Sequence, residues 1–167
     1  MTQDDASPFS VPLLAGTREV AVPVASPDHG YTVQVGGGLL AQLGRLVLRH
    51  KTAGTRVALI SDDQVAPLYG PSVRASLEAA GFGVQLFVVP AGEASKNPAQ
   101  LQSLIEGMIH AGFTRKDLVL TLGGGVVGDL GGLAAASFMR GVDFIQVPTS
   151  LLAQVDASVG GKVAIDL

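Results

Sequence analysis

The feature that most constrains the fold of this chain is a glycine-rich turn that directly follows an apolar run. The run is Leu118-Val119-Leu120-Thr121-Leu122, and the turn continues it as Gly123-Gly124-Gly125-Val126-Val127-Gly128-Asp129. When a buried strand turns directly into a helix, free backbone N–H groups and the positive end of the helix dipole lie at the turn. The sequence therefore predicts a strand–turn–helix unit that can accept an anion.

Isolated charged residues follow this unit. Asp129 is the only charged residue between Asp117 and Arg140. Three more stand alone among apolar residues typical of a protein interior: Asp156, Lys162 and Asp166. Because a charge is costly to desolvate, we expect such side chains to face a polar ligand or one another. A buried structural ion pair between Asp156 and Lys162 is the alternative.

The rest of the chain alternates between apolar runs and helical patterns. Buried strands are predicted at 56–61, 83–89, 117–122 and 144–147, a strand pair at 19–24 and 31–35, and helices at 39–48, after Asp63, after Gly125 and at 151–158. Another helix begins at Asn97-Pro98, with its apolar face at Leu101, Leu104, Ile105, Met108 and Ile109. Strands that are apolar throughout are typical of parallel sheets covered on both faces. We therefore predict an α/β fold, with a Rossmann-like, mainly parallel sheet and helices on both faces.

Composition excludes several classes of protein. The chain is too apolar for disorder, with 47% hydrophobic and 15% charged residues among 167. A net charge of −3 without any basic run argues against a nucleic-acid partner. The absence of cysteine excludes disulfides and thiolate metal sites, and it fits a cytoplasmic protein.

The N-terminal residues and one long apolar stretch bear on the number of domains and on whether the chain spans a membrane. Residues 1–16 lack the basic start of a secretory signal and are predicted to be a flexible lead before one domain at 17–167. The stretch 118–139 is long enough to span a membrane. Its glycines and Asp129 favour a strand, a turn and a helix instead.

In parallel sheets of this kind, ligands bind beyond the carboxyl ends of the strands. The candidate site therefore consists of the polar residues that follow the four predicted strands. They are Asp62 and Asp63, then Gly92, Glu93 and Lys96, then the glycine turn with Asp129, and finally Thr149 and Ser150. Such groups suit sugar hydroxyls and phosphates.

The spacing of Gly123, Gly125 and Gly128 matches the G-x-G-x-x-G pattern of dinucleotide-binding proteins. It departs from the Rossmann fingerprint because it lies late in the chain and no acid follows about 20 residues on. A turn that merely packs a helix closely on a strand is the alternative.

Other candidates also have structural alternatives. Asp129 is expected in the first helical turn, where it would complement the dipole, and Arg140 would do so at the helix end. Glu93 and Lys96 can form a solvated pair. The three histidines, His29, His50 and His110, are too scattered for a metal pair.

Four motifs in fixed order together resemble the 3-dehydroquinate synthase family. They are Gly-Gly-Gly-Val-Val-Gly-Asp-Leu from Gly123, Phe-Met-Arg-Gly from Phe138, Gln-Val-Pro-Thr-Ser-Leu-Leu-Ala-Gln-Val-Asp from Gln146, and Ser-Val-Gly-Gly-Lys from Ser158. Ala-Pro-Leu-Tyr from Ala66 and Gly-Glu-Ala-Ser-Lys from Gly92 extend the resemblance to roughly 31–167.

The resemblance implies an enzyme of the shikimate pathway, which leads to the aromatic amino acids. With NAD and a divalent metal, zinc or cobalt, the family converts 3-deoxy-D-arabino-heptulosonate 7-phosphate into 3-dehydroquinate and phosphate. This reaction combines transient oxidation, phosphate loss, reduction by the same cofactor, ring opening and aldol closure. The resemblance also implies a cytoplasmic homodimer.

The resemblance implies site residues as well. It assigns cofactor contacts to Asp62, Gly92, Glu93, Lys96, Gly124, Gly125, Val126, Val127, Gly128, Asp129, Thr149, Ser150 and Lys162. Asp156 and Lys162 would reach the nicotinamide and the substrate, and Arg140 would reach the substrate phosphate across the dimer interface.

The sequence departs from the family at a few positions. Ser150 stands where a second threonine is common, Ala91 where an aspartate is frequent, and Asp166 where an asparagine is common. The family carries its metal ligands, a glutamate and two histidines, in a second, mostly helical domain. The resemblance implies that these ligands do not lie within the 167 residues.

We therefore expect the NAD-binding half of the enzyme, inactive alone. Three alternatives stay open: an NAD-binding module without catalysis, a polyol or glycerol dehydrogenase of related fold, and a related sugar-phosphate cyclase.

Overall fold

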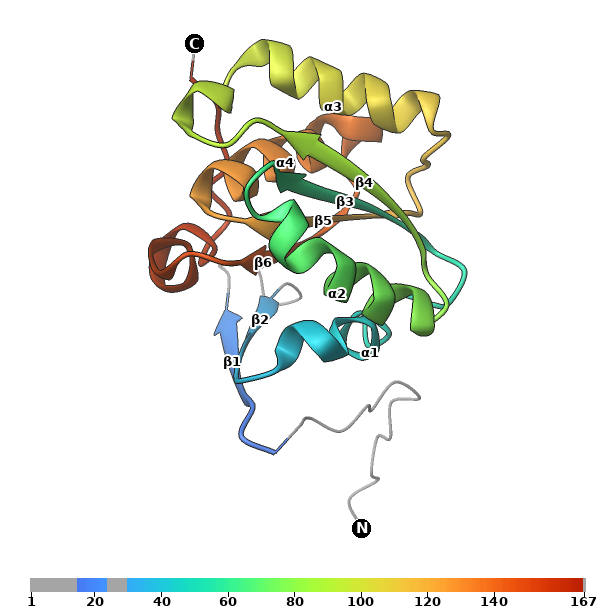
Figure 1. Ribbon diagram of the computed structural model, residues 1–167, viewed down its shortest axis with the longest axis vertical. Helices are drawn as coiled ribbons and strands as arrows, with labels where there is room; N and C mark the ends of the chain where they lie inside the picture. The colour runs from blue at the N-terminus through green and yellow to red at the C-terminus, as the bar shows by residue number, and fades with distance from the viewer. Residues whose placement is uncertain (1–14, 24–29, 167) are drawn as a thin grey trace.

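The computed structural model of the protein describes residues 15–23 and 30–166. Its centre is a parallel sheet of four strands in the order β4-β3-β5-β6 (Figure 1). The strands are β3 (Arg56–Asp62), β4 (Gly83–Val89), β5 (Leu118–Gly123) and β6 (Asp143–Pro148). The predicted parallel sheet is confirmed, and all four strands end at the same edge.

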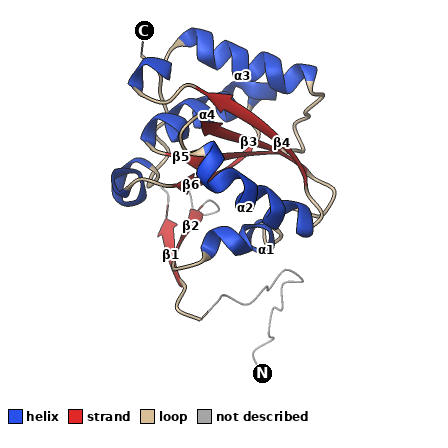
Figure 2. Cartoon of the chain, viewed as in Figure 1, coloured by secondary structure: helices blue, strands red, loops and turns tan. Residues whose placement is uncertain are grey.

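Helices cover both faces of the sheet, as Figure 2 shows. One face packs against α1 (Leu43–Val47) and α2 (Ala66–Ala79), and the other against α3 (Pro98–His110) and α4 (Gly125–Ser137). Four short helical segments complete the domain: η1 (Leu39–Gln42), η2 (Glu93–Ser95), η3 (Phe138–Arg140) and η4 (Ala153–Ala157).

The central strands are apolar throughout because successive side chains enter two different cores. In β3, Ala58 and Ile60 join the core beneath α3 and α4. Their neighbours Val57 and Leu59 join the core beneath α1 and α2. The alternation of side chains along a strand therefore requires hydrophobic residues at every position.

Helix α3 begins and ends as the sequence predicts. The Asn97 side chain accepts a hydrogen bond from the N–H of Gln100 at 2.9 Å, and Gly112 follows the helix with φ 73°. The predicted apolar face is wrong at one position, because Ile109 is 52% exposed while Leu104 and Met108 are buried. Ile109 lies at the margin of the stripe that contacts the sheet.

An antiparallel hairpin, β1 (Arg18–Pro23) and β2 (Gly30–Val35), lies beside the main sheet. The predicted strand pair is thus confirmed, although its last predicted position in the first strand, Val24, lies outside the described residues. So do residues 1–14 of the predicted N-terminal lead. Glu19 ties the hairpin to the domain through an ion pair with Arg49 at 2.9 Å.

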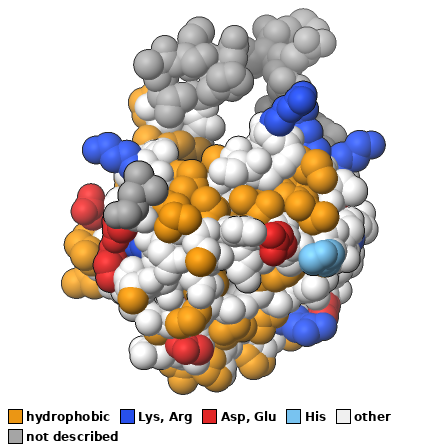
Figure 3. Space-filling view, turned by 90° about the horizontal axis from the view of Figure 1, so that it is seen from above, with side chains coloured by type: hydrophobic (Ala, Val, Ile, Leu, Met, Phe, Trp, Pro, Cys, Tyr) orange, Lys and Arg blue, Asp and Glu red, His pale blue; other side chains and the backbone are white. Residues whose placement is uncertain are grey.

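The long apolar stretch 118–139 forms β5, the turn, α4 and the start of η3, as predicted. In the described part of the chain, no helix combines the length and the apolar character needed to cross a membrane. Figure 3 shows apolar side chains scattered over the side of the molecule that carries α3, with few charged side chains between them.

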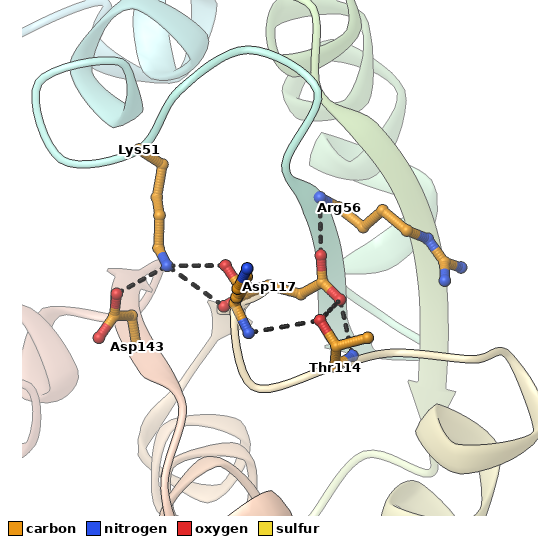
Figure 4. Close-up of polar contacts among 6 residues, drawn as sticks. Lys51, Arg56, Thr114, Asp117 and Asp143 are labelled. Carbon is orange, nitrogen blue, oxygen red and sulfur yellow. Dashed lines mark hydrogen bonds and ion pairs between the residues drawn. The ribbon is translucent and has the colours of Figure 1, made fainter.

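The amino-terminal ends of the strands are joined by a polar network (Figure 4). The ammonium group of Lys51 donates to the carbonyl oxygens of Lys116 and Asp117 at 2.9 and 3.4 Å and pairs with Asp143 at 2.7 Å. The carboxylate of Asp117 accepts from the N–H of Arg56 and from the N–H and hydroxyl of Thr114 at 3.2, 2.7 and 2.9 Å. This network connects the starts of β3, β5 and β6.

Candidate functional site

The glycine turn lies between β5 and α4 at the carboxyl-terminal edge of the sheet. Gly124 precedes the first residue of α4, and its carbonyl oxygen accepts from the N–H of Gly128 at 3.1 Å. The N–H groups of Gly125, Val126 and Val127 therefore precede the first intrahelical hydrogen bond. They point beyond the helix end, where its dipole is positive.

The four glycines of the turn meet different surroundings. A Cβ atom on Gly123 would lie 2.6 Å from Val127, and one on Gly128 would lie 2.8 Å from the Gln146 side-chain oxygen. Close packing thus accounts for Gly123, whereas the end of the flexible Gln146 side chain can move away from Gly128. On Gly124 the nearest atom would be 3.5 Å away and on Gly125 3.4 Å, which are ordinary contacts. Packing within the chain therefore does not require glycine at 124 and 125, and their backbone, which is partly exposed, can be approached by a ligand.

Lys96 is held between two carboxylates at this edge. Its ammonium group lies 3.0 Å from Glu93, in η2, and 3.1 Å from Asp129, in α4. The Lys96 side chain is only 14% exposed, so the expectation of a merely solvated Glu93–Lys96 pair is incomplete. Asp129 is the fifth residue of α4 rather than part of its first turn, and it interacts with Lys96 instead of capping the helix.

The two carboxylates also set the charge state of this cluster. Hydrogen bonds to Glu93 and then to Asp129 raise the pKa of Lys96 above its ordinary value of 10.5. Lys96 is therefore a cation throughout the neutral pH range. It lies on the loop after β4, next to the helix that begins at the glycine turn, and compensates part of the negative charge of the two carboxylates there.

The loop after β3 contributes two acidic residues. Asp62 is buried, and one of its oxygens accepts from the N–H groups of Gln64 and Val65 at 2.9 and 2.7 Å. Among the described residues, no hydrogen-bond partner is found for its second oxygen. The carboxylate of Asp63 accepts from the N–H of Ala91 at 3.1 Å and so joins the loops after β3 and β4.

The remaining predicted cofactor residues lie on the loops after β4 and β6. Gly92 has φ 101°, a conformation that favours glycine and brings the chain into η2. The N–H of Thr149 donates to the carbonyl oxygen of Gly123 at 2.9 Å, which fixes the loop after β6 beside the turn. Ser150 accepts from the N–H of Ala153 at 3.3 Å, a contact that stabilises the helical turn that follows β6.

Asp156 and Lys162 are both exposed, which contradicts their expected interior surroundings. Among the described residues, neither takes part in an ion pair, so the alternative of a buried Asp156–Lys162 pair is wrong. The apolar residues around Asp156 are exposed too, with Leu151 at 75%. The reason is that η4 is short and buries only Ala153 against the domain.

Arg140 lies apart from the other site residues of this chain. It is exposed and follows α4, whose 13 residues place it about 20 Å from the glycine turn. Both Met139 and Arg140 adopt left-handed backbone conformations, with φ 50° and 66°. The structure therefore groups the turn with the loops after β3, β4 and β6 but does not bring Arg140 to them.

No group of three or more potential metal-ligating His, Cys, Asp or Glu side chains occurs among residues 15–23 and 30–166. His50 and His110 are exposed, and His29 lies outside the described residues. A contact that the sequence did not predict involves Tyr31, whose hydroxyl oxygen accepts from the N–H of Gly160 at 2.6 Å. No local pattern could reveal it, because 129 residues separate the two.

Comparison with known sequences gives consistent matches. The family model described as 3-dehydroquinate synthase N-terminal matches residues 86–167. A 3-dehydroquinate synthase from Symbiobacterium thermophilum is 53% identical over 140 residues, which are 84% of this chain and 39% of that protein. The chain thus spans about two fifths of the length of the curated relatives it matches.

Solved structures show the same fold with ligands bound. A 2-deoxy-scyllo-inosose synthase in complex with carbaglucose-6-phosphate, NAD+ and Co2+ aligns with 90% of this chain and 40% of its own, at a TM-score of 0.81 and 25% identity. A 2-epi-5-epi-valiolone synthase from Streptomyces hygroscopicus with NAD+ and Zn2+ aligns with 69% of this chain and 32% of its own, at a TM-score of 0.64 and 30% identity.

Proposed function

The chain belongs to the 3-dehydroquinate synthase family, and we propose that it holds NAD at the carboxyl-terminal edge of its sheet. In the native protein this NAD would serve the conversion of 3-deoxy-D-arabino-heptulosonate 7-phosphate into 3-dehydroquinate and phosphate. The homologues of that name support the reaction, and the two NAD-bound structural neighbours support the cofactor.

The observation that carries this proposal is the space above Gly124 and Gly125. Their backbone is partly exposed at a helix start with free N–H groups. A pyrophosphate needs this combination of close backbone approach and hydrogen-bond donors. The residues present therefore fit the dinucleotide.

The neighbouring loops supply groups for the rest of the cofactor. The second carboxylate oxygen of Asp62, for which no partner is found among the described residues, is an acceptor for ribose hydroxyls. Lys96 reduces the repulsion between the phosphates and the carboxylates of Glu93 and Asp129. The loop with Glu93 follows β4, next to Asp62 at the end of β3. We assign Val126, Val127, Gly128 and Asp129 to the pyrophosphate and ribose, together with Gly92, Thr149 and Ser150 around them.

Asp156 and Lys162 have no partner among the described side chains and are exposed, so both are available to a substrate. NAD supplies a hydride acceptor and donor when bound. Lys162 would attract the phosphate or carboxylate of the substrate, and Asp156 would accept a hydrogen bond from a hydroxyl group. Lys162 also serves the nicotinamide side of the cofactor.

We assign Arg140 to the phosphate of a substrate bound by the other subunit of a homodimer. Its exposed position, remote from the turn of its own chain, is consistent with this role. A divalent metal, zinc or cobalt, completes the proposed chemistry. Its ligands are not found among the described residues, so we derive no step through it.

Residues 1–167 alone are proposed to bind NAD without turnover, because the relatives are much longer than the matched region. An NAD-binding module without catalysis is therefore the second candidate for this chain by itself. The 53% identity to a 3-dehydroquinate synthase and the pair Asp156 and Lys162 favour the synthase over a polyol or glycerol dehydrogenase. The absence of cysteine is consistent with a cytoplasmic location.

The test is phosphate release from the heptulosonate phosphate by the native, full-length gene product. We expect release that requires both NAD and a divalent metal, without net accumulation of NADH. Oxidation of glycerol with accumulation of NADH, and no release of phosphate, would contradict the proposal and identify a polyol dehydrogenase.

A further inference from the structure

Residues 160–166 form an extended segment that carries Lys162. In Figure 1 this segment runs from η4 toward the C label, on the side to which the arrowheads of β3 and β4 point. Its side chains alternate, with Val163 and Ile165 partly buried and Lys162, Ala164 and Asp166 exposed. It belongs to no helix or strand, so its position depends on contacts made elsewhere.

Each end of the segment is held by one hydrogen bond from a distant part of the chain. At its start, the N–H of Gly160 donates to the hydroxyl oxygen of Tyr31 in β2 at 2.6 Å. At its end, the N–H of Asp166 donates to the carbonyl oxygen of Lys96 at 2.7 Å. The second contact joins the segment to the cluster of Lys96 with Glu93 and Asp129.

The middle of the segment packs on α4. A Cβ atom on Gly132 would lie 2.4 Å from Val163, so the absence of a side chain at 132 allows the segment to approach. Ile165 packs against the core that contains α3 and α4. These apolar contacts fix the second half of the segment, whereas Gly160 and Gly161 meet no other atom within contact distance of an added Cβ.

The Tyr31 hydroxyl is therefore the contact that restrains the glycine pair before Lys162. Gly160 has φ 118°, and a glycine pair without such a restraint samples many backbone conformations. Lys162 itself forms no ion pair among the described residues. A flexible Lys162 would lose entropy each time it engaged an anionic substrate.

We propose that Tyr31 is a positioning residue for Lys162, acting through the hydrogen bond from Gly160. The inference rests on the proposed function, in which Lys162 contacts the substrate. The hairpin stays attached without the hydroxyl, because Glu19 pairs with Arg49 and the strand ladder is independent of it. Removal of the hydroxyl thus releases the segment rather than the hairpin.

The direct test is hydrogen exchange of the Gly160 amide in Tyr31→Phe, in the chain of 167 residues. We expect exchange about two- to tenfold faster than in wild type, the range of one net hydrogen bond. The matched control is Gln34→Leu, which removes another hairpin hydrogen bond, from Gln34 to Glu19 at 3.3 Å. The control should leave Gly160 unchanged, and equal exchange in Tyr31→Phe and wild type would overturn the proposal.

A kinetic test separates positioning from stability in the full-length gene product. Tyr31→Phe should lower kcat for phosphate release several-fold more than Gln34→Leu does, while its Tm should shift no more than that of Gln34→Leu. Equal losses of kcat in both variants would mean a structural role only and would overturn the proposal. If wild type releases no phosphate although Gly160 is protected, the assigned reaction fails while the contact stands.

Discussion

Charged side chains at the two edges of the parallel sheet differ in whether they have interaction partners. At the amino-terminal edge, Lys51 interacts with Asp143 and two carbonyl oxygens, and Asp117 accepts three hydrogen bonds. At the carboxyl-terminal edge, Asp156 and Lys162 have no ionic partner among the described residues. The same strands thus begin in a satisfied network and end in available groups.

We interpret this difference as a division between structural and ligand-binding roles within one domain. Polar groups that satisfy one another lower the free energy of folding and leave little capacity for a ligand. Charged groups that have no ionic partner among the described residues, beside a glycine turn with a partly exposed backbone, contribute little to folding and are available for binding. Lys96 belongs to both groups: it is paired with two carboxylates, and it lies at the carboxyl-terminal edge beside the proposed binding site.

The largest expected effect is the loss of turnover when Lys162 is replaced by alanine. Because Lys162 is exposed and forms no ion pair with the residues that the structure describes, the fold should remain intact. Phosphate release by the full-length gene product should fall by about 10²-fold or more, as for other groups that stabilise developing charge. Lys116→Ala is the control, since that side chain is exposed at the opposite edge. Normal turnover in Lys162→Ala would remove this residue from the mechanism.

The next largest effect is expected from a substitution at the amino-terminal edge, which should lower stability without changing NAD binding. Asp117→Ala removes the acceptor of three hydrogen bonds and should reduce the free energy of unfolding by about 2–3 kcal/mol. Thermal unfolding should show a Tm lower by about 5–10 °C. NAD affinity should not change, and Asp117→Asn should recover part of the stability. A weaker NAD affinity in a folded Asp117→Ala protein would contradict the claim that the amino-terminal edge has only a structural role.

Lys96→Met tests the cluster that joins binding and structure. The variant keeps the apolar stem but leaves Glu93 and Asp129 unneutralised near the proposed pyrophosphate, so NAD affinity should fall about tenfold, or 1.4 kcal/mol. Since the pKa of Lys96 is raised above 10.5, its contribution in wild type is complete at neutral pH and is lost only as the pH rises through that raised value. Titration calorimetry at pH 6 and 9 should give the same contribution from Lys96. If the NAD affinity of wild type differs between pH 6 and pH 9 and this difference is absent in Lys96→Met, the assignment is contradicted.

The smallest expected effect is the loss of the ion pair between Glu19 of the hairpin and Arg49 at low pH. The hydrogen bond from Arg49 holds the pKa of Glu19 below 4.5, so the pair stabilises the folded state above pH 4.5 and is lost as the pH falls through the lowered value. The chain has no tryptophan and two tyrosines, so Tyr69→Phe leaves Tyr31 as the only strong fluorophore. Its emission should change with a midpoint below pH 4.5. An unchanged transition in Glu19→Gln would show that another group is responsible.

Most of the fold was predictable because both sides of the sheet are covered. A strand such as β5 is buried at every position and appears in the sequence as one apolar run that begins at Leu118 and ends at Gly123. The failures are also physical. Ile109 is as apolar as its neighbours, and only the width of the helix contact shows that it is exposed. The same limit applies to Asp156, whose apolar neighbours do not pack on this domain.

The candidate site was less predictable than the fold. Local spacing places the glycine turn at the end of a strand, but it does not show that Asp129 lies beyond the first helical turn and meets Lys96. That contact depends on how α3 and α4 pack side by side. The hydrogen bond between Tyr31 and Gly160 has no sequence signal at all, because it joins two elements far apart in the chain.

Calorimetric titration of NAD into residues 1–167 tests the central claim most directly. Wild type should bind one NAD per chain, and Asp117→Ala should bind it equally well. Gly124→Ala should fold normally, since its Cβ would meet the nearest atom at 3.5 Å, but should bind NAD about tenfold or more weakly because the methyl group occupies the approach of the pyrophosphate. A folded wild-type chain without saturable binding, or equal affinity in wild type and Gly124→Ala, would contradict the account.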